Sequence, residues 1–90
     1  MLQFEYTGQF KRDLKLAKRR NKNLSLLQKI MDLIIAQKIL SPQLKDHTLS
    51  GNWTGHKELY IESDWLLIYK IYCKDNKVVF VRTGSHSDLF

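Results

Sequence analysis

Two histidines, an aspartate and an arginine in the second half of the chain carry the functional groups of an acid–base site. They are His47, Asp64, Arg82 and His86. An ordinary imidazole titrates at about pH 6.5 and exchanges protons near neutrality, and a guanidinium can bind phosphate through two parallel hydrogen bonds. RNA carries its own nucleophile, the 2′-hydroxyl, so its cleavage needs only a base, an acid for the leaving 5′-oxygen and a cation for the phosphorane. The four residues could therefore cleave RNA without a metal.

Each of the four also has a more ordinary explanation. A histidine judged singly is more often a surface or hydrogen-bonded residue than a catalyst. Asp64 precedes Trp65 at an expected turn, where an aspartate commonly accepts hydrogen bonds from backbone amides. Arg82 could instead form a salt bridge with Glu58 or Glu62. Catalysis requires the four side chains to converge, and their spacing in the sequence does not impose this.

Three aromatic residues could stack on nucleobases. Trp53, Trp65 and Phe90 are the candidates, since an exposed ring adds roughly 1–3 kcal/mol per stacked base. The alternative is that a tryptophan in so small a domain lies in the core. His56, beside Gly55 at the start of an expected strand, is interpreted as structural.

The positive charge gathers in the N-terminal half. The formal net charge is +6, and residues 1–45 hold ten Lys and Arg against three Asp and Glu, whereas residues 46–90 hold five against six. Such a cluster attracts polyanions because each neutralised phosphate releases counterions, although a solvated helix face has the same appearance. The cations expected to bind RNA are Lys11, Arg12, Lys15, Lys18 and Arg19.

The N-terminal half is expected to form a strand and two helices. Residues 2–6 alternate apolar and polar side chains, which is typical of a strand with one buried face. Apolar residues then recur at helical spacing over residues 8–20, with Thr7 as the N-cap, and again over residues 24–38. The break between these segments predicts an antiparallel helical hairpin.

The C-terminal half is expected to form a three-stranded antiparallel meander. An irregular loop over residues 41–52, which contains His47, precedes strand-like runs at residues 56–61, 66–73 and 78–83. This order predicts an α+β fold in which the hairpin covers one face of a single sheet. The other face is expected to be open and to carry the functional site.

The composition indicates one ordered domain in a reducing compartment. Apolar residues make up 43% of the chain and charged residues 27%, which excludes a low-complexity protein, and residues 1–90 suffice for one core. The single cysteine, Cys73, excludes an internal disulfide and lacks the paired spacing of a zinc site. Because we find no signal peptide and no run of about eighteen apolar residues, we expect a cytoplasmic protein that does not enter the membrane.

Four ordered motifs resemble those of a known toxin family. They are Tyr6-Thr7-Gly8-Gln9-Phe10-Lys11 with Asp13, Lys45-Asp46-His47 with Leu49 and Gly51, Asp64-Trp65-Leu66-Leu67-Ile68-Tyr69-Lys70, and Arg82-Thr83-Gly84-Ser85-His86 with Leu89 and Phe90. Over essentially the whole chain they are similar to the YafQ branch of the RelE/ParE superfamily of toxin–antitoxin toxins. The resemblance implies a RelE-like fold and a ribosome-dependent messenger-RNA endonuclease that uses no metal or other cofactor. It also implies a cognate DinJ-type antitoxin, and we expect the toxin alone to be monomeric.

The resemblance further implies roles for individual residues. The matching positions are His47, Asp64 and His86 for acid–base chemistry, Arg82 for phosphate charge, and Trp65 and Phe90 for the shape of the site. Tyr60 is a departure, because many YafQ-type toxins have a histidine there. A phenol is a poor base at neutral pH but can donate a hydrogen bond to phosphate or serve as an acid, so Tyr60 is expected to contact the substrate. Ser63 replaces the family's usual proline and is expected to loosen the turn.

Two other functions remain open from the sequence. A ParE-like toxin would poison DNA gyrase by binding it, and its toxicity would survive loss of every histidine. A non-catalytic RNA- or protein-binding module would make Tyr60 a sign of lost activity, although Asp64, Arg82, His86 and Phe90 all occur in the chain. The sequence does not identify which histidine is the acid, the codon preference or the antitoxin-binding surface.

Overall fold

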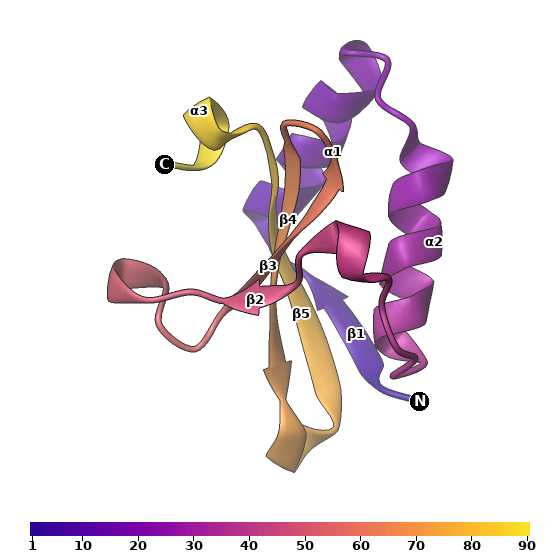
Figure 1. The fold of residues 1–90 in the computed structure, drawn as a ribbon, viewed down its shortest axis with the longest axis vertical. Coiled ribbons are helices and arrows are strands. Elements are labelled where there is room, and N and C mark those ends of the chain that lie inside the picture. The colour runs from indigo at the N-terminus through magenta and orange to yellow at the C-terminus, as the bar shows by residue number, and fades with distance from the viewer.

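The computed structural model describes residues 1–90 and contains one five-stranded sheet packed against two helices (Figure 1). Its helices and strands are β1 (Gln3–Tyr6), α1 (Gly8–Arg19), α2 (Leu24–Ile35), β2 (His47–Thr48), β3 (Lys57–Glu62), β4 (Trp65–Tyr72), β5 (Lys77–Gly84) and α3 (His86–Leu89). The strand order is β1-β5-β4-β3-β2, with β1 parallel to β5 and the other neighbours antiparallel. The predicted α+β fold with a helical hairpin and a C-terminal meander is confirmed. No helix is long and apolar enough to cross a membrane.

Local hydrogen bonds set the limits of the two long helices. At the start of α1, the Thr7 hydroxyl oxygen accepts a hydrogen bond from the backbone N–H of Phe10, as predicted for an N-cap. The second helix ends at Ile35 rather than at residue 38. Gln37 adopts a left-handed conformation with a φ of 58°, and its N–H bonds back to the carbonyl of Ile34. This arrangement satisfies carbonyl groups that the last turn would otherwise leave unpaired.

The main hydrophobic core lies between the helical hairpin and the sheet. Phe10 of α1, Leu27 of α2 and Phe80 of β5 are among its fully buried members. Each such side chain stabilises the fold by about 1.5–3 kcal/mol relative to an exposed position. Because successive residues of a strand point to opposite faces, this packing also fixes the side chains on the far face of the sheet.

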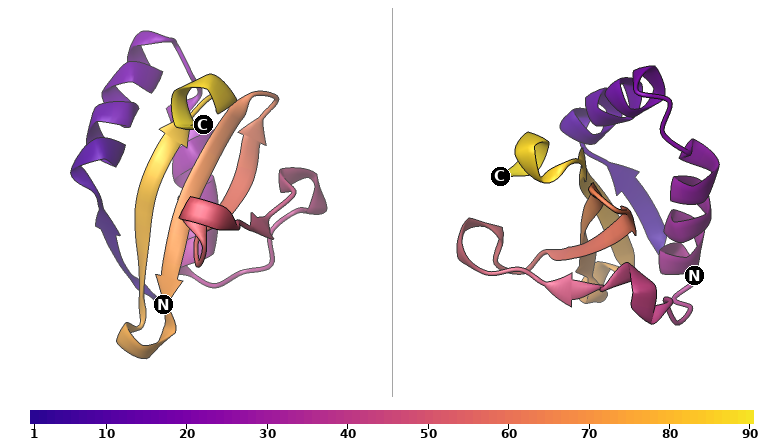
Figure 2. Two further views of the ribbon diagram at one scale, coloured as in Figure 1. Left: turned by 90° about the vertical axis from the view of Figure 1, so that its left-hand side faces the viewer. Right: turned by 45° about the horizontal axis from the view of Figure 1, so that its top comes forward.

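A smaller cluster covers part of that far face. Leu66 and Ile68 of β4 are fully buried and pack with Leu89 of α3, while Trp53 joins them from the loop after β2. Figure 2 shows α3 and this loop standing on the side of the sheet away from α1 and α2. The face that was expected to be open is therefore partly covered. We call it the site face, defined by Glu58, Tyr60, Leu66 and Ile68.

His47 lies on a short edge strand rather than in the predicted loop. Strand β2 pairs antiparallel with β3, which places His47 opposite Glu58 and Thr48 opposite Lys57. A two-residue strand has no hydrophobic period that the sequence could reveal. The pairing gives His47 a fixed position on the site face.

Candidate active site

Asp64, His86 and Tyr60 form a continuous chain of polar contacts on the site face. One Asp64 carboxylate oxygen accepts hydrogen bonds from the His86 backbone N–H at 3.1 Å and from its ring Nδ1 at 2.9 Å. The other ring nitrogen, Nε2, lies 3.4 Å from the Tyr60 hydroxyl. Because the carboxylate only accepts, Nδ1 carries the proton, and in the neutral ring Nε2 accepts from the phenol. His86 thus presents a proton-accepting nitrogen to the site.

A capping box at the start of α3 and an ion pair between Arg20 and Asp88 hold His86 in this position. His86 begins α3, which follows a capping box in which Ser85 and Asp88 exchange side-chain and backbone hydrogen bonds. Arg20, the C-cap residue of α1, contacts Asp88 at 2.7 Å and thereby ties α3 to the end of α1. The Arg20 hydrogen bond and the Ser85 backbone N–H lower the pKa of Asp88 to about 2. The hydrogen bonds from the His86 side chain and backbone likewise lower the pKa of Asp64.

His47 and His86 lie on the same side of the sheet. His47 pairs with Glu58, and Tyr60, two residues further along β3, contacts His86. Two residues advance a strand by about 7 Å. The His47 ring is held by the Lys45 carbonyl, 2.6 Å from Nδ1, and by the Glu58 carboxylate, 3.3 Å from Nε2. Both histidines therefore reach the same face of the sheet.

A cation lies over the same region. The Lys45 ammonium stands 5.9 Å from the centre of the Tyr60 ring, within the range of a cation–π contact. The ring of Phe90 lies 6.1 Å from that of His86, and Phe90 is 60% exposed. Lys45 thus places a positive charge next to Tyr60, and Phe90 places an exposed aromatic ring next to His86.

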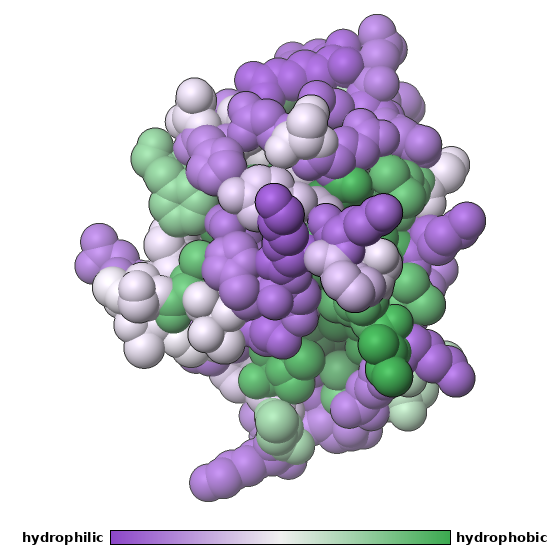
Figure 3. Space-filling model, viewed as in Figure 1, coloured by the Kyte–Doolittle hydropathy of each residue, from purple (hydrophilic) through white to green (hydrophobic).

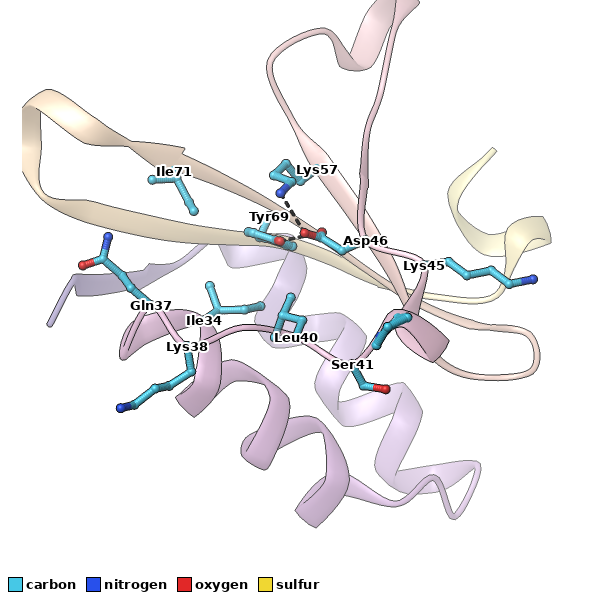
Figure 4. Close-up of a pocket in the computed structure, with 11 residues that line it drawn as sticks. Ile34, Gln37, Lys38, Leu40, Ser41, Lys45, Asp46, Lys57, Tyr69 and Ile71 are labelled. Carbon is cyan, nitrogen blue, oxygen red and sulfur yellow. Dashed lines mark hydrogen bonds and ion pairs between the residues drawn. The ribbon is translucent and has the colours of Figure 1, made fainter.

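Asp46 anchors the segment that presents Lys45 and His47. Its two carboxylate oxygens accept hydrogen bonds from the Tyr69 hydroxyl at 2.6 Å and the Lys57 ammonium at 2.7 Å. Burial, together with the contact to Asp46, raises the pKa of Tyr69, so the phenol remains a donor. Figure 4 shows this anchor at a cavity of about 460 Å³, with the Lys45 side chain extending away from it. Both neighbours of Asp46 are positioned by this anchor.

Arg82 forms a salt bridge with Asp13, a partner that was not predicted from the sequence. Its Nε and Nη2 contact the two oxygens of Asp13 at 2.8 and 3.2 Å, and the backbone N–H of Thr83 joins the same carboxylate. The suggested salt bridges with Glu58 or Glu62 are therefore wrong. Since Asp13 is buried on α1, the contact fastens α1 to β5 and leaves only Nη1 of the guanidinium without a protein partner.

The three aromatic residues predicted to contact the substrate, Tyr60, Trp65 and Phe90, differ in the structure. Trp65 is 1% exposed and belongs to the core beneath the helices, so the prediction that its ring contacts the substrate is wrong. An indole is large and apolar enough for burial to outweigh exposure in a small domain. Phe90 and Tyr60 lie beside His86, where their rings can meet a ligand.

The predicted RNA-binding cations share the exposed face of α1. Lys11, Arg12, Lys15, Lys18 and Arg19 are all exposed, whereas Phe10, Asp13 and Ala17 of the same helix are buried. Figure 3 shows hydrophilic surface over the upper part of the molecule, where α1 and its connection to α2 lie. The helix therefore presents a basic surface on the side of the sheet opposite the site face.

Sequence reasoning missed Lys45, Asp46 and Glu58 as parts of the site. The run Lys45-Asp46-His47 was visible as a motif, but the contacts of Asp46 come from distant positions on β3 and β4. Glu58 shares a strand face with Tyr60, which strand alternation could have shown. Across the whole chain, no group of three or more His, Cys, Asp or Glu side chains could hold a metal ion.

Comparisons with known proteins show the family to which the chain belongs. Residues 2–90 match the family described as bacterial toxin of type II toxin–antitoxin system, YafQ. The chain is 42% identical over 87 residues to the mRNA interferase toxin YafQ of Escherichia coli strain K12, covering 96% of this chain and 92% of that protein.

Solved structures give the same result. A chain in the crystal structure of the E. coli DinJ–YafQ complex is 41% identical, with a TM-score of 0.90 over 100% of this chain and 99% of that one. The crystal structure of a metal-bound toxin from Helicobacter pylori is 37% identical, with a TM-score of 0.94 over 100% of both chains. The chain described here belongs to the YafQ family of bacterial toxins of type II toxin–antitoxin systems.

Proposed function

We propose that this toxin is a metal-independent, ribosome-dependent endoribonuclease that cleaves messenger RNA and is inhibited by a DinJ-like antitoxin. The observation that carries the proposal is the series of polar contacts from Asp64 through His86 to Tyr60, with His47 on the same face of the sheet. A relative of 42% identity is named an mRNA interferase. The phosphodiester and its neighbouring 2′-hydroxyl are the substrate groups that such a site would act on.

In the proposed reaction, His86 is the base. The 2′-hydroxyl takes the place of the Tyr60 phenol at Nε2 and gives up its proton as the 2′-oxygen bonds to phosphorus. Asp64 orients the ring through Nδ1 and offsets the positive charge that forms on it. The bond between phosphorus and the 5′-oxygen breaks, and the leaving oxygen receives a proton from His47. The products are a 2′,3′-cyclic phosphate and a 5′-hydroxyl.

The negative charge on the phosphorane would be met by Lys45, with Arg82 in support. The Lys45 ammonium already lies over the Tyr60 ring, whereas two nitrogens of Arg82 are bound by Asp13. We therefore propose that Lys45 makes the closer contact with the phosphate. A preorganised cation of this kind stabilises charge that develops only in the transition state.

The remaining partners follow from charge and from the relatives. The exposed cations of α1 would bind ribosomal RNA while the site face meets the message. A relative occurs as a complex of DinJ and YafQ, and an acidic, partly disordered antitoxin suits a toxin with a net charge of +6. The protein would act in the cytoplasm, where its substrate is translated.

Mapping the 5′ ends of cellular messages after induced expression tests the proposal. The wild type and His56→Gln, which changes the histidine remote from His86 and Asp64, are expected to generate new 5′ ends inside translated reading frames. His86→Ala is expected to generate none, since positioned acid–base groups contribute about 10²- to 10⁴-fold to rate. Removing the start codon of a reporter should protect it if cleavage requires the ribosome.

Two outcomes would contradict the proposal. New 5′ ends at wild-type frequency in folded His86→Ala would show that His86 is not the base. Growth arrest by every variant without any new 5′ end would favour a gyrase-binding toxin instead.

A further inference from the structure

Glu58 is a buried carboxylate on the site face. Its residue is 3% exposed, and strand pairing places it between His47 on β2 and Ile68 on β4. One oxygen, Oε1, lies 3.3 Å from His47 Nε2, and the other, Oε2, is buried without a hydrogen-bond partner. Burying a carboxylate is costly unless it is paired, and an apolar residue of similar size would be more stable there. Its presence therefore indicates a role beyond packing.

The contacts of His47 show what that role is. The Lys45 carbonyl can only accept, so the Nδ1 atom of His47 donates to it across 2.6 Å. The second nitrogen, Nε2, faces the carboxylate of Glu58. The ring is therefore held at both nitrogens, by the Lys45 carbonyl on one side and by the Glu58 carboxylate on the other. Glu58 is thus placed to hold the His47 ring in a fixed orientation.

The other charged groups nearby have different partners. Lys57 and Asp46 form an ion pair that also includes the Tyr69 hydroxyl, and the Lys45 ammonium lies over the Tyr60 ring. Glu62, the other carboxylate of β3, is exposed and makes no ion pair. Glu58 is accordingly the acidic partner of His47, as Asp64 is of His86.

We infer that Glu58 is a positioning residue that fixes the orientation of the His47 ring for its proton-transfer step. The inference rests on the proposed nuclease function and adds a second histidine–carboxylate pair to the site. The two pairs differ in exposure, because the side chain of Asp64 is 62% exposed and that of Glu58 only 4%. The His47 side chain is 45% exposed, so the carboxylate of Glu58 is shielded from water while the ring that it contacts reaches the surface.

The first test compares Glu58→Gln with the matched control Glu62→Gln in cleavage of message on programmed ribosomes. Glutamine keeps the shape of Glu58 and removes its charge. The expected result is a kcat at least tenfold below wild type, with KM changed less than threefold, while Glu62→Gln behaves as wild type. A double-mutant cycle with His47→Gln is expected to show that Glu58→Gln causes no further loss once His47 is absent.

The second test measures the Glu58–His47 contact without relying on catalysis. Diethyl pyrocarbonate modifies accessible, unprotonated imidazole nitrogens, and mass spectrometry can follow each of the three histidines separately. Modification of His47 is expected to be several-fold faster in Glu58→Gln than in wild type, while His56 and His86 serve as internal references.

The outcomes separate the inference from the function it rests on. If wild type cleaves message and Glu58→Gln matches it in both kcat and His47 modification, the inference is overturned. If wild type does not cleave message, the proposed function fails, and the modification rates still decide whether Glu58 shields His47. Thermal unfolding of each variant shows whether a lost activity reflects lost structure, and the modification assay is then made at a temperature where both proteins are folded.

Discussion

In the proposed reaction, the contact between Tyr60 and His86 determines how the substrate hydroxyl reaches the ring nitrogen. The phenol oxygen lies 3.4 Å from Nε2, a long contact that a substrate hydroxyl can replace. Tyr60 then remains beside the reacting phosphate, beneath the Lys45 ammonium. A tyrosine at this position therefore supplies a hydrogen-bond donor but not a base at neutral pH.

Tyr60→Phe is expected to slow cleavage by about tenfold, because one hydrogen bond contributes about 0.5–1.5 kcal/mol net. The ring that supports Lys45 is retained, so the loss should be smaller than that of His86→Ala. Tyr60→His is expected to retain activity or raise it. Single-turnover cleavage of ribosome-bound message measures these rates. A loss in Tyr60→Phe as large as in His86→Ala would mean that the phenol itself transfers the proton.

At the residue scale, the sequence predicted residue types better than residue partners. His47, Asp64 and His86 were chosen for their chemistry, and the structure places them around one sheet face. The partner of Arg82 was missed because Asp13 lies 69 positions away in the sequence. Trp65 was misjudged because an indole can be buried or exposed, and only the three-dimensional packing decides which.

Among the elements, α3 is short and depends on contacts with α1 for its position. Four residues cannot sustain a helix alone, so the Arg20–Asp88 ion pair and the Ser85 capping box hold His86 in place. Because Arg20 is largely exposed, the pair is expected to control local order rather than global stability.

Arg20→Gln is expected to loosen α3 and to reduce cleavage several-fold while leaving every proton-transfer group in place. Amide hydrogen exchange at residues 86–89 should become faster, and the exposed Lys29→Gln serves as the matched control on α2. Unchanged exchange and unchanged cleavage in Arg20→Gln would show that the ion pair does not position His86.

The same contact predicts an acid response. The folded-state pKa of Asp88 is depressed to about 2. Its contribution to the stability of α3 is therefore complete above the ordinary aspartate pKa of about 4 and is lost as the pH falls from there toward 2. The depressed pKa of Asp64 acts in the same direction. In wild type, the amide signals of α3 should therefore change over this interval, whereas Asp88→Asn should lack the Asp88 part of that change.

The long elements were predictable and the short ones were not. The helices and β3 to β5 have enough residues to show a period, and Thr7 marks the start of α1. Strand β2 exists because Asp46 is bound by Tyr69 and Lys57, and such distant contacts leave no local trace in the sequence. His47 lies on β2 and His86 on α3, so the site depends on these short elements. The sequence could therefore predict the residue types of the site but not their geometry.

The whole molecule has two distinct surfaces on opposite sides of the sheet, to which the proposal gives different tasks. The cations on α1 lie on the helical side of the sheet, while His47, Tyr60 and His86 lie on the opposite, site face. If the cations of α1 bind ribosomal RNA, the message must reach the protein on the opposite surface, the site face. This arrangement accounts for the proposed dependence on the ribosome, because a short free RNA would engage one surface without the other.

The central claim is that the site face uses the 2′-hydroxyl of RNA as the nucleophile. The most direct measurement is cleavage of a ribosome-bound message that carries a single 2′-deoxynucleotide on the 5′ side of the cut, using protein stripped of transition metals. The account predicts a 2′,3′-cyclic phosphate and a 5′-hydroxyl from the unmodified message, and no cleavage at the deoxy position. Cleavage of the deoxy message at the unmodified rate, or products ending in a 5′-phosphate, would contradict it.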